Sequence, residues 1–374
     1  MPSHKNALLI ALTFFVLLFI ISHSKIIADS TANEEAQIAA MEQAIKDNSD
    51  LATLFSWFGD PKRVLQRFNK GKEKAEKQWQ EQQASIQKIK NMGTTQSLEI
   101  IPLIDWHTKN ERLKGEAGIS YLIKTDHSTI LFDVGLNSPQ SDPSPLLSNM
   151  KELGIKLDDI DTIVISHNHG DHVGGGDWSR QRTFSLTSHQ IDLGSKTVYT
   201  PVPMTYPGLS PVLAQNPTKI CNGVTTIGTI TNRMFFTGLA AEQALAANVK
   251  GKGIVLIVGC GHQKLIKLLE RVSALFDEPI YGFIGGLHYP VTDSRLVFNG
   301  IKAQMYFGTG KVPWEPITLE EVDENTRLLK KYHPGIVRLS GHDSCDASLA
   351  VFRRAFPKIY DEVRVGERVV IKTQ

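Results

Sequence analysis

Cysteine is scarce in this chain, since only three of its 374 residues are cysteines. Cys221, Cys260 and Cys345 are too few to build a disulfide framework. Net charge is also small, because 41 lysines and arginines against 39 aspartates and glutamates leave a formal charge of +2. With few aromatic residues beside basic clusters, this balance gives no electrostatic case for binding nucleic acid. We therefore expect a small-molecule substrate, while the oligomeric state stays unknown.

Long hydrophobic runs are missing as well, apart from one near the N-terminus. Residues 7–21 are apolar except for Thr13, and Lys5 precedes them. This is short for a membrane-spanning helix, which needs about 20 residues, but it suits the core of a signal peptide. Small residues suited to cleavage follow at Ala28 and at positions 30–32. We expect residues 1–28 to be a signal peptide or membrane anchor, so that the remainder is exported to the periplasm or another extracytoplasmic space.

The following segment, residues 33–92, is polar and favours helix. Apolar residues recur at helical intervals from Leu51 to Phe68, and Gly59-Asp60-Pro61 divides them into two helices. We expect solvated helices that pack on the main domain or space it from the membrane, with partner binding as the alternative. Residues 93–95 are expected to be a linker, and residues 97–374 to form the main domain.

The most informative segment runs from Ser166 to His172. It places His167, His169, Asp171 and His172 directly after an apolar run that predicts a buried strand. Imidazole nitrogen and carboxylate oxygen are ligands of zinc and similar ions, and without a cation these groups would repel or desolvate one another. Side chains two apart at an extended strand end point the same way, so the first two histidines can share one ion. The other two residues can reach a second ion from the turn that follows.

Two such ions, about 3.5–4 Å apart, can hold a hydroxide between them. We therefore expect two divalent cations, with zinc as the first candidate and iron or manganese as alternatives that suit the same ligands. Asp171 is the catalytic candidate, because it could hold the second ion, orient the nucleophile and receive its proton.

Further ligands are expected from the second half of the chain. Three apolar strands there are each followed by a loop with glycine and histidine, at residues 259–262, 285–288 and 341–342. Functional groups gather beyond strand ends in layered α/β folds. His262 and His342 are predicted metal ligands, and His288 is either a ligand or a group that touches substrate. Cys260 could ligate as a thiolate, bridge to Cys345 in an oxidising compartment, or be a small buried residue.

The pattern His167-x-His169-x-Asp171-His172 resembles the signature of the metallo-β-lactamase superfamily. Residues 118–135 are similar to the opening hairpin of that family. The resemblance implies an α/β fold, a four-layer αββα sandwich with the metal site along one edge of its two sheets. It also implies that Asp133 orients a ligand histidine and that Cys260 stands where other members have a bridging aspartate.

One branch of the superfamily is similar in more detail. Segments 113–118, which include Glu116, and 259–262, 285–288 and 341–345 match in order the dihydropterin synthase-like branch. That branch is named for an enzyme of methanopterin biosynthesis that makes a dihydropterin–ribofuranosylaminobenzene phosphate. The chain departs from it at Gly261, where serine is usual, and at Asp343, where cysteine is usual. Glu116, with Asp133, Cys260 and His288, is a candidate for supporting the ligands or touching substrate.

Together these features predict a metal-dependent hydrolase that uses a hydroxide held by two metal ions. An ester, lactone or phosphoester is the expected substrate type. A transferase, as the branch implies, and an exported non-enzymatic protein that binds or senses metal are the alternatives. Two irregular segments with aromatic residues, 200–217 and 299–316, are expected either to shape the substrate pocket or to be structural.

Overall fold

The computed structural model describes residues 33–373, which divide into two compact units with the boundary after Arg67. The first unit contains helical residues 33–47 and α2 (Ser49–Phe58). The Asn48 side chain begins α2 by accepting two backbone N–H groups, and Gly59 ends it. The expected signal peptide or anchor, residues 1–28, lies outside the described residues. From residue 33 to residue 373, no helix combines the length and the apolar character needed to span a bilayer.

Helix α3 (Pro61–Ser85) begins with the proline that follows Gly59-Asp60, as the sequence indicates. The boundary between the two units falls within this helix. From Phe68 on, α3 packs on the second unit. The rings of Phe68 and Phe235 lie 5.0 Å apart, and Trp79 lies under the cationic group of Arg271. Most of α3 is therefore part of the larger unit.

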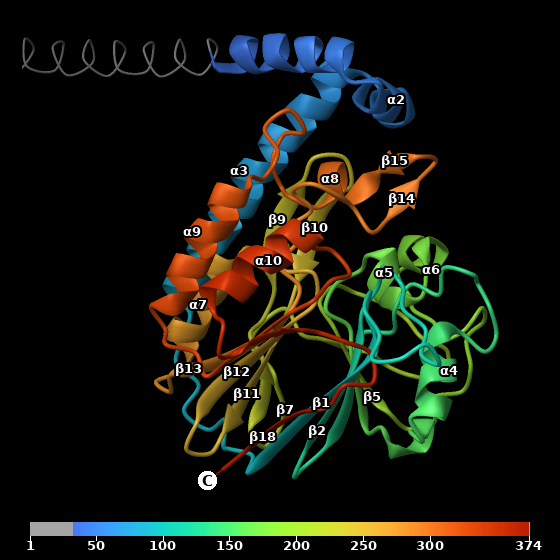
Figure 1. Ribbon diagram of the computed structural model, residues 1–374, viewed down its shortest axis with the longest axis vertical. Helices are drawn as coiled ribbons and strands as arrows, with labels where there is room; N and C mark the ends of the chain where they lie inside the picture. The colour runs from blue at the N-terminus through green and yellow to red at the C-terminus, as the bar shows by residue number, and fades with distance from the viewer. Residues whose placement is uncertain (1–32, 374) are drawn as a thin grey trace, which may run out of the picture. The chain divides into compact units, whose positions relative to one another are not determined.

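Two mixed seven-stranded sheets form the centre of the second unit (Figure 1). The first sheet has the order β18 (Val369–Lys372), β1 (Ser97–Ile104), β2 (Ser120–Thr125), β3 (Thr129–Phe132), β4 (Thr162–Val164), β5 (Thr197–Thr200), β6 (Val212–Leu213). The second has the order β17 (Tyr360–Glu362), β16 (Ile336–Leu339), β13 (Ile280–Gly285), β12 (Gly253–Val258), β11 (Leu245–Val249), β8 (Val224–Thr226), β7 (Lys219–Cys221).

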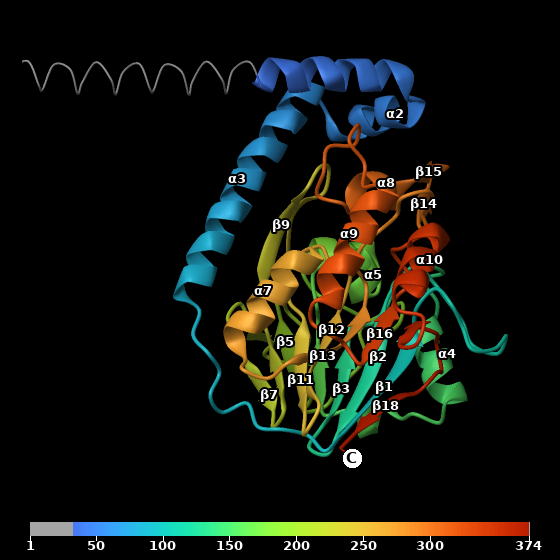
Figure 2. The same ribbon diagram turned by 60° about the vertical axis from the view of Figure 1, so that its left-hand side comes forward.

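Helices cover the outer faces of both sheets, so the expected α/β fold with two sheets and flanking helices is confirmed (Figures 1 and 2). The second sheet is covered by α7 (Leu265–Leu275), α9 (Leu319–Lys330) and α10 (Asp346–Ala355). The first is covered by α4 (Pro145–Glu152). The remaining elements are η1 (Leu157–Asp159), α5 (Gly170–Val173), α6 (Gly176–Gln181), β9 (Ile230–Met234), β10 (Gly238–Glu242), β14 (Val297–Phe298), β15 (Ile301–Lys302) and α8 (Ala303–Phe307).

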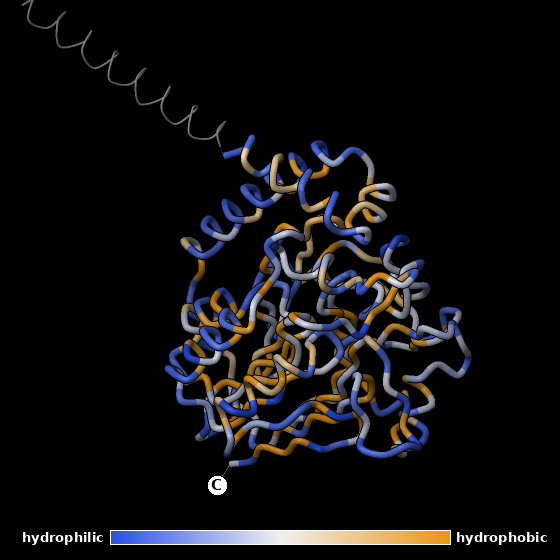
Figure 3. Tube along the Cα trace, turned by 45° about the horizontal axis from the view of Figure 1, so that its top comes forward, coloured by the Kyte–Doolittle hydropathy of each residue, from blue (hydrophilic) through white to orange (hydrophobic). Residues whose placement is uncertain are grey.

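Strand β12 shows why the central strands are continuously apolar. Val255 and Ile257 face the first sheet across the inner core, whereas Leu256 and Val258 face the helices on the outside. Side chains alternate along a strand, so a strand buried on both faces needs apolar residues at every position. Figure 3 shows the same concentration of hydrophobic residues inside this unit.

The directions of the strands bring the loops with the predicted ligands to the same end of the sheets. β12, β13 and β16 are parallel neighbours, so their carboxyl ends lie at one edge of the second sheet. β4 lies parallel to β3 and β5 in the first sheet, and residues 165–172 follow its carboxyl end. The four loops that contain the predicted ligands therefore all begin at strand ends.

Candidate metal centre

The first ligand loop leaves β4 at Val164, earlier than the apolar run suggests, and continues as irregular backbone to His169. His167 Nε2 and His169 Nδ1 nevertheless lie 3.0 Å apart. His169 is the N-cap of α5, whose first turn carries Asp171 and His172. The segment from His167 to His172 thus contributes to different donor groups, one that includes His169 and another that includes His172.

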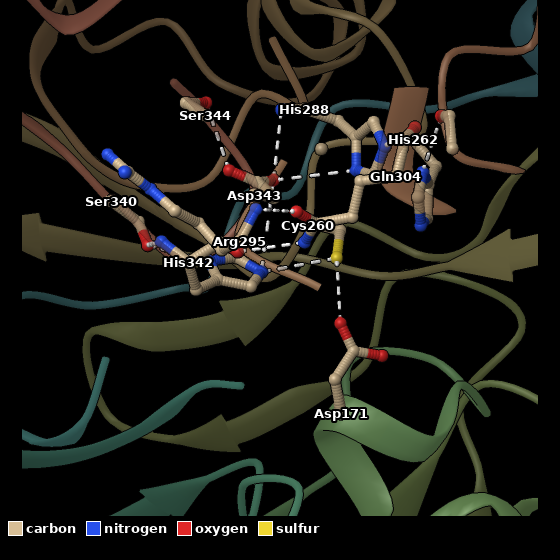
Figure 4. A network of polar contacts seen from close by, with 12 residues as sticks. Asp171, Cys260, His262, His288, Arg295, Gln304, Ser340, His342, Asp343 and Ser344 are labelled. Atoms are coloured by element: carbon tan, nitrogen blue, oxygen red, sulfur yellow. Dashed lines mark hydrogen bonds and ion pairs between the residues drawn. The ribbon is translucent and has the colours of Figure 1, made fainter. Parts of the chain in front are cut away.

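The second sheet supplies the other donors. Cys260 and His262 follow β12, and His342 follows β16. His262 Nε2 lies 3.2 Å from His169 Nδ1, which joins it to the first two histidines. Cys260 Sγ lies 3.3 Å from His342 Nε2 and 3.7 Å from the Asp171 carboxylate, between donors of both sheets (Figure 4). The six predicted metal ligands therefore lie close together, and Cys260 lies between them.

The donors form overlapping groups in which every donor atom lies within 4.8 Å of the others. Four such groups are present among the described residues: Asp171, His172, Cys260 and His342; His167, Cys260 and His262; His167, His169 and Asp171; and Cys260, His288 and Asp343. Two nitrogens bound tetrahedrally to one zinc ion at about 2.0–2.1 Å would be roughly 3.3 Å apart. The observed separations of 3.0 and 3.2 Å between histidine nitrogens match this value. The buried cluster suits metal binding.

Three of the predicted ligand histidines each have one ring nitrogen held by a group outside the predicted ligand set. His172 Nδ1 lies 2.7 Å from Asp133 Oδ2, the contact implied for Asp133 by the family resemblance. His342 Nδ1 lies 2.6 Å from Ser340 Oγ, and His262 Nδ1 lies 3.0 Å from a backbone carbonyl oxygen. Such contacts turn the other ring nitrogen toward the cluster and are typical of metal-ligating histidines.

Burial sets the charge of these groups in the protein itself. It lowers the pKa of His167 and, with nearby His172, lowers that of His342 to about 3, so both rings are neutral as ligation requires. Burial alone would lower the pKa of His172, but the carboxylates of Asp171 and Asp133 raise it to about 10. Burial also raises the pKa of the Cys260 thiol. A bound cation would oppose the last two effects, because it favours the neutral imidazole of His172 and the thiolate of Cys260.

Two of the other candidates have different contacts. His288 lines the cavity above the cluster, with its Nε2 3.2 Å from the Gln304 carbonyl oxygen and its backbone N–H donating to Asp343. Its buried Nδ1 has no hydrogen-bond partner among the described residues. Glu116 instead accepts backbone N–H groups from residues 136, 137 and 138, and so orders the loop after β3.

All three cysteines are free, so no Cys260–Cys345 bridge forms.

Two buried acids that support the cluster were not identified from the sequence. Glu242 accepts the backbone N–H groups of Gly261 and His262, at 2.9 and 2.8 Å, and so shapes the loop after β12. Asp105 accepts a hydrogen bond from the Ser340 hydroxyl, at 2.6 Å, and through it acts on His342. The available signal was an acidic residue at the end of an apolar strand, which holds for both.

A cavity of about 710 Å³ opens above the ligand cluster. Its lining includes His167, His169, Asp171, His262 and His288, together with side chains from α3, α6, β10 and α8. This volume is in the range of small-molecule sites. The segment 299–316 contributes Gln304, Phe307 and Gly308 to it, and the segment 200–217 contributes Val202.

Comparison with known proteins gives several similarities. The model of the metallo-beta-lactamase superfamily matches residues 114–185, which contain the first four predicted ligands. A 7,8-dihydropterin-6-methyl-4-(beta-D-ribofuranosyl)-aminobenzene-5'-phosphate synthase of Methanocaldococcus jannaschii is 25% identical over 270 residues, or 60% of this chain and 88% of that enzyme. The anti-Pycsar protein Apyc1 of Saccharibacillus brassicae is 37% identical over 54 residues, 14% of this chain and 19% of its own. A solved structure described as a metal-dependent hydrolase of the beta-lactamase superfamily is 19% identical and covers 74% of this chain and 100% of its own, with a TM-score of 0.48.

Proposed function

Because this chain belongs to the metallo-β-lactamase superfamily, we propose that it is a hydrolase that requires two divalent cations, with zinc as the first candidate. The observation that carries the proposal is the convergence of buried donors from both sheets on one small volume. One ion would be held by His167, His169 and His262. The other would be held by Asp171, His172 and His342. Cys260 lies beside both groups and would contribute its sulfur.

Cations in this position would supply a nucleophile at neutral pH and polarise a carbonyl or phosphoryl oxygen of an ester, lactone or phosphoester. The protein's own side chains would position the water and the metal ligands. Asp171 lines the cavity and, in this proposal, orients the attacking water and receives its proton. Asp133 and Ser340 hold the rings of His172 and His342 in place. Glu242 holds the loop that carries Cys260 and His262.

The proposal is tested by elemental analysis and by turnover on a panel of esters, lactones and phosphoesters. We expect about two ions per chain. His169→Ala and Asp171→Ala should lose bound metal, and turnover should fall by more than about 100-fold. His189→Ala is the matched control, because His189 is largely exposed and its ring lies near Asp142 rather than the cluster. Full turnover in a demetallated His169→Ala protein would refute the proposal.

A transferase is the second candidate, supported by the similarity to the synthase over 88% of that enzyme's length. The same donors would then serve a reaction in which a group other than water attacks. Incubation with a dihydropterin and candidate partners, followed by mass analysis of the products, separates the two reactions. A condensed product without simple hydrolysis would favour the transferase. Metal-loaded protein that turns over neither set would favour the non-enzymatic alternative.

A further inference from the structure

The cavity above the metal cluster has an uneven distribution of charge. Apart from histidines, its ionisable lining contains three cations, Lys74, Arg180 and Arg182. The one carboxylate in the lining formed by residues 33–373 is Asp171, which belongs to the ligand cluster. Arg180 is paired with Asp177, so its charge is partly balanced. Lys74 and Arg182 have no ion pair with any residue that the structure describes, and their charge acts on whatever enters the cavity.

Lys74 reaches the cavity because of the way α3 packs. Gly71, Lys74 and Gln78 are spaced so that they share one face of the helix, and the last two line the cavity. Gly71 lies so close to β9 that a methyl group there would be 2.6 Å from the side chain of Arg233. Arg271 also contacts α3, because its Nε–H donates a hydrogen bond to the Gln83 side chain at 3.0 Å. The position of Lys74 therefore follows from helix docking.

Arg182 holds an unusual backbone conformation. It ends α6 with φ +54° and ψ +50°, the left-handed region, which costs a residue with a Cβ atom on the order of 1 kcal/mol. Its backbone N–H donates to Ser179, and its carbonyl accepts from Thr205. Glycine or asparagine would suit this turn better. A strained residue whose side chain lines a cavity is evidence for a role in binding.

The cavity lining also contains apolar residues. Val202, Leu239, Leu296 and Phe307 contribute to it from four different segments. Leu239 is 46% exposed, and residue 297, which follows Leu296, is 57% exposed. An apolar surface thus continues from the cavity to the outside of the molecule. A substrate with an apolar part would bury this surface on binding.

We infer that the substrate is a small amphipathic anion, a hydrolysable ester whose apolar chain ends in a carboxylate or phosphate group. Lys74 and Arg182 bind the anionic end, and Leu239 and Leu296 contact the chain. The scissile bond then lies over the metal cluster. This inference rests on the proposed hydrolase function, and it adds the class of substrate to it.

The test compares substrates that differ only in charge. Metal-loaded full-length protein is assayed with 4-nitrophenyl hexanoate, with its analogue that ends in a carboxylate, mono-4-nitrophenyl adipate, and with an analogue that ends in a phosphonate. We expect kcat/KM to be at least about tenfold higher for the anionic esters, because charge-assisted hydrogen bonds are strong. The preference should shrink as ionic strength rises. Comparing kcat/KM for the carboxylate ester and the phosphonate ester shows which anionic group the site prefers.

Variants locate the preference. Lys74→Ala and Arg182→Gly should each reduce the ratio of anionic to neutral kcat/KM by about tenfold, mainly through KM, and Lys74→Arg should retain most of it. Arg182→Gly keeps the left-handed turn, so loss of fold is not a concern. Lys77→Ala is the control, since Lys77 lies on the same helix and pairs with Glu81. An equal rate for all esters in the wild type, or an unchanged ratio in both variants, would overturn the inference.

Binding measurements keep this result separate from the proposed function. Calorimetry with adipate is carried out on the same metal-loaded proteins. If wild type binds adipate and the two variants bind it about tenfold more weakly, the anion site stands even when no ester is hydrolysed, and only the hydrolase proposal fails. If esters are hydrolysed but adipate binds equally to all proteins, the anion site fails and the hydrolase proposal stands.

Discussion

Cys260 gives the cluster a donor of a different chemical kind. Its sulfur lies 3.1 Å from His172 Nε2, 3.3 Å from His342 Nε2 and 3.7 Å from the Asp171 carboxylate. A thiolate is softer than the carboxylate implied at this place in other members of the superfamily. Soft donors favour zinc and cobalt over magnesium or calcium. The identity of this residue therefore bears on which ion the protein selects.

Cobalt substitution would detect the sulfur directly. Protein loaded with Co²⁺ should show a thiolate-to-metal absorption band in the near ultraviolet, and Cys260→Ser should lose the band. Cys345→Ser is the matched control, because Cys345 is equally buried but contacts Thr292 and Ser348 instead of the ligands. A band that persists in Cys260→Ser would show that the sulfur is not a ligand.

At the scale of an element, the short helix α5 depends on the glycine that ends it. Gly174 has φ +87° and follows directly after the turn that carries Asp171 and His172. Its backbone N–H donates to the carbonyl of residue 170, and a methyl group at this position would collide with the carbonyl oxygen of Ser185. The close approach of these two segments sets where the ligand turn lies.

Gly174→Ala should destabilise the fold by more than about 2 kcal/mol, because it combines a left-handed conformation with a collision against backbone. Gly154→Ala isolates the first effect. Gly154 has φ +68° but nothing within 4 Å of the added methyl group, so a cost of about 1 kcal/mol is expected. Urea unfolding of the metal-free proteins measures both values. Equal losses in the two variants would contradict the importance of the contact with Ser185.

Functional residues that lie close together in the sequence could be predicted from it, whereas contacts between distant segments could not. The donors of residues 167–172 are local in sequence, and the strand–glycine–histidine pattern indicated His262 and His342. Asp105 could not be linked to His342 in the same way, because its partner Ser340 is 235 residues away. The position of Lys74 in the cavity lining could not be predicted for a related reason. Periodicity predicts the helix that contains it, but the docking that turns it toward the cavity depends on α7 and β9.

At the scale of the whole molecule, the described residues contain the fold and the cluster, while residues 1–28 bear on where the protein works. The expectation that this segment directs export stays a prediction. We propose that the remainder of the chain functions in an extracytoplasmic space, either released or held to the membrane by the N-terminal segment. The apolar run with a preceding lysine supports this.

Fractionation of cells that express the full chain tests this proposal. The protein should be found in the periplasmic or membrane fraction, and N-terminal sequencing should reveal whether cleavage occurs near Ala28. A chain without residues 1–28 should remain in the cytoplasm. If the full-length chain is found in the cytoplasm with its N-terminus intact, the prediction of export is wrong.

The division of the ligands between the two sheets has a consequence for biogenesis. The first four donors are synthesised long before His342, which follows β16. In the proposed two-ion centre, a nascent chain that ends before this point would have an incomplete set of donors and could not hold both ions. Metal loading must therefore be a late event that follows synthesis of the last sheet strands, and the ion pool that matters is the one the protein meets when it folds. For a chain that is exported before it folds, that is the pool beyond the membrane.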